Sequence, residues 1–215
     1  MYECNGNAVM KKNRELLKSR AMHIISGVFF SVIFMLFAYT HLVFFIKTQE
    51  FALLAFCMSE TLIVGFYIMR SKPITISAEF YDWLIAIVGT FLPLLFRPTD
   101  TGIVPMAKHV IMAGSFFQIL GVISLNRSFA LVAANRTIKT QWMYGVVRHP
   151  IYASYCITLL GYVLTYTSIE NALIYVLSMA FLFLRILSEE KHLNVDDCYK
   201  NYTQKVRYKL IPFIF

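Results

Sequence analysis

The chain has 215 residues, of which 58% are hydrophobic and only 15% are charged, and its formal net charge is +8. Ordinary globular domains contain roughly a quarter charged residues, so this composition excludes a soluble domain and predicts an integral membrane protein. The positive charge does not indicate a nucleic-acid partner. The basic residues lie in short runs between apolar stretches, where anionic lipid head groups would meet them.

Apolar stretches of spanning length recur along the chain. A membrane-spanning helix needs about 20 apolar residues, with a workable range of roughly 17 to 25. The sequence therefore predicts an all-α fold, a polytopic membrane helical bundle of about six transmembrane helices. In chain order the predicted spans are residues 21–46, 51–69, 80–96, 110–125, 151–167 and 171–187.

Lys and Arg gather on one side of these spans. They are concentrated before the first span, after the second, after the fourth and after the sixth. The opposite loops hold only Lys47, Arg97 and Lys108. Because cytoplasmic loops carry an excess of Lys and Arg, we predict a multi-pass membrane protein with both termini in the cytoplasm.

Isolated polar residues within the spans are weaker signals. Glu60 and Asp82 are acids in or beside spans, where ionisable groups are functional candidates, although we favour capping or pairing near an interface. His23 and His41 lie toward the two ends of the first span, which favours interfacial side chains over ligands. The four cysteines form no C-x-x-C pair and no zinc pattern, so we predict reduced thiols and no metal site.

A polar motif stands directly before the fifth predicted span. It reads Tyr144-Gly145-Val146-Val147-Arg148-His149-Pro150-Ile151-Tyr152. Proline is well tolerated in the first turn of a helix, so we expect Arg148 and His149 at the cytoplasmic mouth of this helix. The N–H groups of a helix N-terminus suit a carboxylate or a phosphate. The alternative is an interfacial anchor of Arg and aromatic side chains.

A second ionisable cluster ends the sixth predicted span. Arg185 and Glu189 are four residues apart and share one helix face, which could be a simple ion pair worth about 0.3–0.5 kcal/mol. The apolar hairpin formed by residues 151–187, however, returns the chain to the side that it left. We therefore expect this cluster to lie near Arg148 and His149, where an apolar substrate enters from lipid and a polar cofactor from the cytosol.

These motifs, taken in order, resemble those of the isoprenylcysteine carboxyl methyltransferase family and are similar to those of the related membrane phospholipid N-methyltransferases. The resemblance covers roughly residues 125–212. Its motifs are Arg148-His149-Pro150-Ile151-Tyr152, Glu189-Glu190-x-x-Leu193, Tyr199-x-x-Tyr202-x-x-x-Val206 and the closing Ile211-Pro212. One departure is Trp142, which stands where the family usually has glycine.

The resemblance implies an S-adenosylmethionine-dependent methyltransferase with a cytoplasmic-side cofactor site formed by the C-terminal third. It implies catalytic roles for Arg185, as the substrate-side arginine, and Glu189. The implied cofactor-binding residues are Arg136, Thr137, Ile138, Lys139, Tyr144, His149, Pro150, Ile151, Tyr152 and Glu189. The chain then divides into a basic cytoplasmic N-terminus (residues 1–20), N-terminal transmembrane helices (21–105) and a methyltransferase-like membrane domain with a C-terminal helical tail (106–215).

Two kinds of methyl acceptor remain open. The carboxylate of a prenylated cysteine or a similar lipidic acid is already ionised and needs only a cationic clamp, which Arg185 can supply. A phospholipid amine would instead need a base, such as Glu189 or Glu190; a small hydrophobic thiol or acid is a further alternative. A transporter or structural membrane protein is disfavoured, because the ionisable residues gather at one face and no internal repeat is visible. A nicotinamide-dependent reductase with a similar tail has a larger helical body than this chain.

Overall fold

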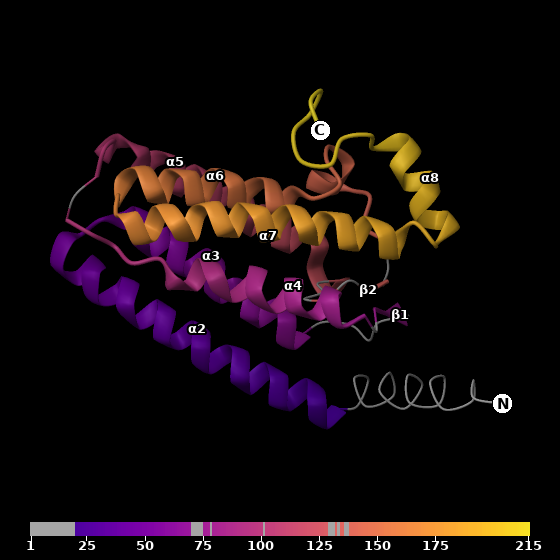
Figure 1. The fold of residues 1–215 in the computed structure, drawn as a ribbon, viewed down its shortest axis with the longest axis horizontal. Helices are drawn as coiled ribbons and strands as arrows, with labels where there is room; N and C mark the ends of the chain where they lie inside the picture. The colour runs from indigo at the N-terminus through magenta and orange to yellow at the C-terminus, as the bar shows by residue number, and fades with distance from the viewer. Residues whose placement is uncertain are drawn as a thin grey trace.

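The computed structural model describes residues 20–69, 75–77, 79–100, 102–128, 132, 134–135 and 138–215. The predicted basic N-terminus lies outside them, apart from Arg20. Long helices run roughly along one another in an elongated bundle (Figure 1). The elements are α2 (Arg20–Thr48), α3 (Phe51–Met69), β1 (Thr75–Ile76), α4 (Phe80–Phe91), α5 (Lys108–Leu125), β2 (Ala134–Asn135), α6 (Pro150–Thr165), α7 (Ile169–Leu193) and α8 (Asp197–Lys205). Apart from the two-residue ladder of β1 and β2, the prediction of an all-α fold is confirmed.

The predicted spans correspond to helices of two lengths. Among the described residues, four helices are long and apolar enough to cross a membrane: Gly27–Thr48, Phe51–Met69, Pro105–Leu125 and Ile169–Leu193. The third and fifth predicted spans coincide with shorter apolar helices, Phe80–Leu95 and Pro150–Thr165. A multi-pass membrane protein follows from the four long helices, and the count of six spans stays a prediction.

The last long helix extends further than its hydropathy predicted. α7 continues beyond residue 187 to Leu193, so Arg185 and Glu189 lie on one uninterrupted helix. Its buried residues recur at helical spacing, since Leu182, Ile186 and Glu190 are each four residues apart. The buried stripe of α7 therefore carries on past the point where the sequence becomes polar.

Asn171 fixes the hairpin between α6 and α7 at the end of the bundle remote from α8. The Ser168 hydroxyl caps α7 by accepting a hydrogen bond from the Asn171 N–H at 3.1 Å. The Asn171 side-chain amide donates to the carbonyl oxygens of Arg97 and Tyr166, at 2.8 and 2.7 Å. This one buried side chain therefore joins the hairpin to the segment that follows α4.

α5 and α6 approach closely because glycines line their interface. A Cβ atom at Gly114 would lie 2.3 Å from the Thr158 hydroxyl and 2.7 Å from the Thr158 backbone nitrogen. A Cβ at Gly161 would lie 2.7 Å from the backbone nitrogen of Ile111. Small residues that let backbones approach are a common basis of helix association in membranes. These glycines fix α6, and with it the motif at its N-terminus.

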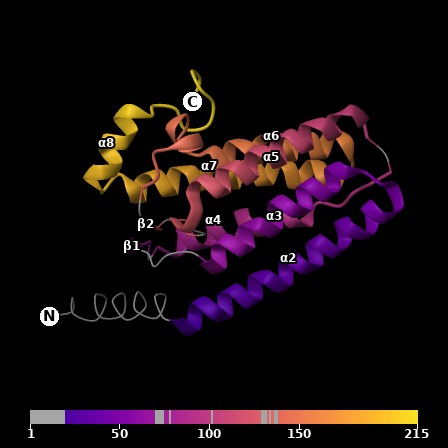
Figure 2. The same cartoon turned by 180° about the vertical axis from the view of Figure 1, so that it is seen from behind.

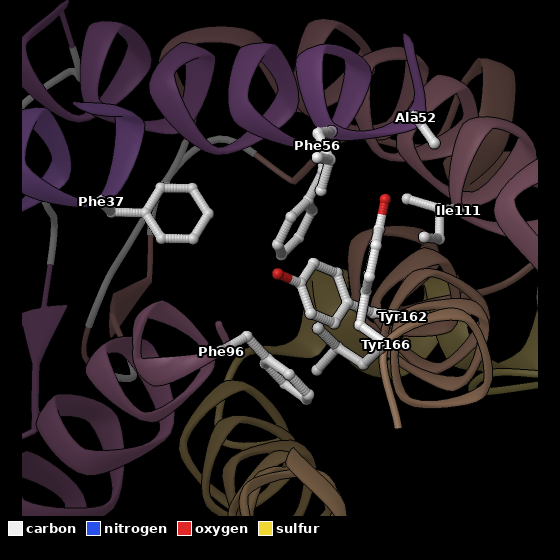
Figure 3. Close-up of a cluster of buried hydrophobic side chains, with 9 residues drawn as sticks. Phe37, Ala52, Phe56, Phe96, Ile111, Tyr162 and Tyr166 are labelled. Carbon is white, nitrogen blue, oxygen red and sulfur yellow. The ribbon is translucent and has the colours of Figure 1, made fainter. Parts of the chain in front are cut away.

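An aromatic cluster fills the bundle between these helices. It includes Phe37, Phe56, Phe96 and Tyr162, whose rings point toward one another (Figure 3). The prediction that His41 is an interfacial side chain is wrong, because its ring is only 1% exposed. His41 Nδ1 lies 3.0 Å from the Phe37 carbonyl oxygen and must donate to it. His41 Nε2 therefore accepts from the Tyr162 hydroxyl, at 2.9 Å.

At the end of the bundle opposite the α6–α7 hairpin, polar contacts join α4, β1 and α7. Asp82 accepts hydrogen bonds from the hydroxyls of Ser77 and Ser188, the second at 2.7 Å. The Thr75 hydroxyl lies 3.1 Å from His192 Nε2. Both views place β1, β2 and α8 at this end, while α2 lies along the outer edge of the bundle (Figure 2 shows it from behind). The end of α7 is thus held from two sides.

Candidate active site

A cavity opens at the end of the bundle where α8 lies. It contains about 1260 Å³ of empty space, part of it open to solvent. Its polar end is lined by Lys139, Tyr144, Arg148, His149, Glu189, Tyr199 and Tyr202. Its deep end is lined by Ile63, Pro93, Tyr155, Leu159, Ser178 and Leu182. Arg185 and Tyr152 also line it, and both motifs predicted from the sequence therefore meet at one cavity.

Glu190 is the centre of a buried network at the polar end. Its carboxylate accepts from Arg148 Nη1 at 2.6 Å and lies 2.8 Å from His149 Nε2. The Tyr199 hydroxyl donates to the same carboxylate at 2.8 Å. The sequence placed Glu189, rather than Glu190, beside Arg148 and His149. The four-residue spacing from Leu182 and Ile186 was the signal that puts Glu190 on the buried face of α7.

Glu189 points into the cavity instead. It accepts a hydrogen bond from the Tyr152 hydroxyl, and its second oxygen lies 3.8 Å from His149 Nδ1. The His149 ring stacks on Tyr152 with centroids 5.6 Å apart. The Glu189 side chain remains 19% exposed. It is therefore an oriented carboxylate on the cavity wall, whereas Glu190 is enclosed by its partners.

Arg185 lies between the polar and the apolar ends. Its Nη1 donates to the Thr90 hydroxyl at 3.1 Å, and its guanidinium carbon lies 5.1 Å from the centre of the Tyr152 ring. Its Nη2 is 3.9 Å from Glu189, which is too long for a strong hydrogen bond. Gly89 gives it room, because a Cβ there would lie 3.0 Å from Arg185 Cδ. Thr90, Tyr152 and Glu189 thus surround the cation.

The C-terminal segment closes the polar end. The Tyr202 hydroxyl donates to the Tyr144 carbonyl oxygen at 2.7 Å, and the N–H groups of Arg148 and His149 each donate at 2.9 Å to carbonyl oxygens of the segment after α8. Burial, followed by the negative charge of Glu190, raises the pKa of Tyr199 above its ordinary value. The Tyr199 hydroxyl therefore stays a hydrogen-bond donor at neutral pH.

The comparison with protein families decides the class of this site. Residues 99–201, just under half of the chain, match the phospholipid methyltransferase family. This part of the chain is therefore similar to the methyltransferases of that family. These methyltransferases use S-adenosylmethionine, which confirms the predicted cofactor. A comparison with curated proteins found no match.

The cavity of this methyltransferase fits the chemistry of its cofactor. S-adenosylmethionine has a cationic sulfonium and ammonium, a carboxylate and an adenine ring. The polar end offers the Glu189 carboxylate for the positive charges and the cations Lys139 and Arg148 for the carboxylate. Arg148 Nε is buried and has no hydrogen-bond partner among the described residues. The rings of Tyr144 and Tyr199 add apolar surface for the adenine.

The other residues predicted to hold the cofactor are placed less uniformly. Ile138 and Ile151 line the cavity, whereas Pro150 begins α6 and does not. Arg136 and Thr137 lie outside the described residues. Trp142 has a backbone φ of 57°, in the left-handed region that favours glycine. Trp142 is 71% exposed and is not among the residues that line the cavity, so the departure from the family's glycine leaves the cavity open.

The sequence missed the contribution of α3 to the methyltransferase. Glu60 lies in the middle of α3 and is only 1% exposed, so of the two predicted roles, capping or pairing near an interface, it does not cap a helix end but pairs inside the bundle. Its carboxylate accepts from Gln118 Nε2 and from the Tyr155 hydroxyl, each at 2.8 Å. Tyr155 lines the cavity. An N-terminal helix outside the matched residues therefore holds a wall of the site.

Proposed function

We propose that the protein transfers a methyl group from S-adenosylmethionine to the carboxylate of a lipidic acid, such as a prenylated cysteine. The observation that carries this proposal is the place of Arg185. It is the guanidinium between a polar end that suits the cofactor and an apolar end that suits a lipid chain. Its guanidinium contacts Thr90, Tyr152 and Glu189, and a guanidinium has five N–H donors in a planar fork that suits an anionic head group.

The chemistry needs alignment more than acid or base catalysis. A new bond forms between the acceptor oxygen and the methyl carbon while the bond from that carbon to sulfur breaks, and the electron pair goes to sulfur. No proton is released, because the carboxylate is already ionised. Arg185 would orient the carboxylate with two hydrogen bonds, and Glu189 would hold the cationic end of the cofactor. Positioning of this kind supplies a large part of the rate of bimolecular reactions.

A second candidate is methylation of a phospholipid amine. The matched family is described as phospholipid methyltransferase. The Glu189 carboxylate, which accepts a hydrogen bond from Tyr152, lies on the cavity wall. In this reaction a bond forms from nitrogen to the methyl carbon while the bond from that carbon to sulfur breaks, the electron pair goes to sulfur, and the nitrogen loses a proton. Glu189 is placed to accept that proton. Arg185 would then face the phosphate of the same lipid.

The experiment uses the full-length protein in lipid nanodiscs with methyl-labelled S-adenosylmethionine. N-acetyl-S-farnesylcysteine and phosphatidylethanolamine are offered separately. Base-labile methyl ester formed only from the farnesylcysteine supports the proposal, and labelled N-methyl lipid alone supports the second candidate.

Two variants and a matched control test the residue roles. Arg185→Ala is expected to abolish transfer with cofactor binding retained, whereas Glu189→Ala is expected to lose cofactor binding. Arg97→Ala, at the other end of the bundle, is the control and should retain both. Cofactor binding by Glu189→Ala equal to that of the parent protein contradicts its assigned role.

A further inference from the structure

The deep end of the cavity is an apolar space that ends inside the bundle. Beyond Arg185, no charged side chain of the described residues lines it. Its walls are Ile63 from α3, Pro93 from the turn after α4, Leu159 from α6, and Ser178 and Leu182 from α7. A space with these walls can hold a hydrocarbon chain but offers nothing to a charged group.

The depth of this apolar space, counted from Arg185 and Tyr152 at its mouth, is the same along α7 and along α6. On α7, Ser178 lies seven residues from Arg185, and on α6, Leu159 lies seven residues from Tyr152. At 1.5 Å per residue, both correspond to about 10 Å. The hydrocarbon core of a bilayer is about 30 Å thick, so this depth is shorter than one leaflet. The enclosed part of a bound chain is therefore short.

The floor is Leu159, behind which lies the aromatic cluster of Figure 3. Leu159 belongs to that cluster and is 1% exposed, and it packs together with Phe56, Phe96 and Tyr162. Interiors of this kind are close-packed and resist the entry of further atoms. A chain that reaches Leu159 cannot continue without displacing these rings.

Ser178 is the small residue opposite this floor. It is 3% exposed, and its hydroxyl has no hydrogen-bond partner among the described residues. Hydroxyls on membrane helices usually bond back to their own helix, as Thr158 does to the Ser154 carbonyl oxygen at 2.9 Å. A leucine side chain in place of Ser178 would fill the end of the space.

The deep end also belongs in part to helices outside the matched family. Ile63, Gly89, Thr90 and Pro93 line the cavity but precede residue 99, where the match begins. The polar end, in contrast, is built almost wholly from matched residues. The shape of the deep end therefore depends in part on this chain's own N-terminal helices.

We propose that the deep end selects methyl acceptors by the length of their apolar chain, with Leu159 and Ser178 setting the longest chain that is fully enclosed. This inference rests on the proposed function, since it takes the acceptor's head group to lie at Arg185. Enlarging the floor favours longer chains, and filling it favours shorter ones.

The test compares N-acetylcysteine thioethers with straight alkyl chains from hexyl to hexadecyl. Full-length protein in nanodiscs is assayed with labelled S-adenosylmethionine, as wild type, Leu159→Ala and Ser178→Leu. Leu173→Ala, on the exposed face of α7, is the matched control, and size-exclusion profiles confirm folding. In parallel, the same thioethers with a diazirine at the chain end are photocrosslinked, and the labelled peptides are identified by mass spectrometry. Crosslinking does not depend on methyl transfer.

The expected result is an optimum chain length in the wild type and in Leu173→Ala. Leu159→Ala should move it to longer chains and Ser178→Leu to shorter ones, with the ratio of long-chain to short-chain activity changing by at least about tenfold. Activity without an optimum, or one unmoved by both variants, overturns the chain-length proposal and leaves the function intact. Crosslinks near Leu159 and Ser178 without any methylation contradict the proposed function, the methylation of a lipidic acid, but support the selection of ligands by chain length. If no crosslinks form near Leu159 and Ser178, the chain-length proposal is contradicted.

Discussion

Glu189 and Glu190 are neighbours in the chain but contact different parts of the site. Glu190 neutralises the buried Arg148 and also contacts His149, so its removal leaves the Arg148 cation without its carboxylate partner in a buried position. We expect Glu190→Ala to lower the free energy of unfolding by about 3–5 kcal/mol. Glu189→Gln should change it little and should instead weaken cofactor binding. Thermal unfolding in detergent, with and without S-adenosylmethionine, measures both effects, and equal melting temperatures for the two variants would contradict the assignment.

Trp142 shows how one residue can carry backbone strain. Its φ of 57° is disfavoured for every residue with a Cβ atom, by about 1–2 kcal/mol. Trp142→Gly and Trp142→Ala both remove the exposed ring, but only glycine relieves the backbone. We expect the glycine variant to be more stable than the alanine variant by about 1 kcal/mol. Equal unfolding midpoints for the two would show that the loop is not strained at this position.

The candidate site could be predicted from the sequence only in part. The hairpin correctly brought Arg185 and Glu189 to Arg148 and His149, because a chain that crosses an apolar layer twice must return to its starting face. The division of roles within the Glu189-Glu190 pair depends on which face of α7 is buried, which the adjacent positions do not show. The hydrogen bond from Tyr155 to Glu60 joins residues 95 positions apart, and no local sequence pattern predicts such a contact.

At the scale of elements, the closest helix contact is that of α5 with α6, and it depends on glycine. Gly114→Ala would place its Cβ 2.7 Å from a backbone nitrogen of α6, and backbone cannot move aside as a flexible side chain does. We expect this variant to lower thermal stability strongly and to lose methyl transfer, because α6 carries the His149–Tyr152 motif. Gly65→Ala is the matched control, since a Cβ at Gly65 meets nothing within 4 Å. It should be neutral or raise stability by up to about 1 kcal/mol; similar losses in both variants would refute the close-packing argument.

α3 is the element whose role the sequence left undefined. It provides Ile63 to the cavity wall and Glu60 to the hydroxyl of Tyr155. The N-terminal helices are therefore part of the site as well as of the membrane-embedded body. The predicted boundary near residue 105 separates segments of the sequence, whereas the cavity is shared between them.

At the scale of the whole molecule, the positions of the helices followed from hydropathy alone. Within lipid each backbone polar group must be satisfied inside its own segment, so apolar stretches of about 20 residues form helices. This constraint does not operate beyond the apolar layer. The residues after 187 are polar, and the continued helix of α7 there is stabilised by burial of Glu190 and by the bonds of Ser188 to α4. Hydropathy could not detect either contact.

The orientation of the molecule in its membrane is a prediction that the bundle makes easy to test. Cys198 on α8 is exposed beside the site, and Asp100 is exposed near the α6–α7 hairpin at the other end. We prepare one variant that retains only Cys198 and one cysteine-free variant with Asp100→Cys. The excess of basic residues on the α8 side predicts that this side faces the cytoplasm. A membrane-impermeant maleimide should therefore label Cys198 in inside-out vesicles and the cysteine at position 100 in intact cells. The reverse pattern would place the site on the outer face, where cytosolic S-adenosylmethionine does not reach it, and labelling of both positions from one side would contradict a spanning hairpin.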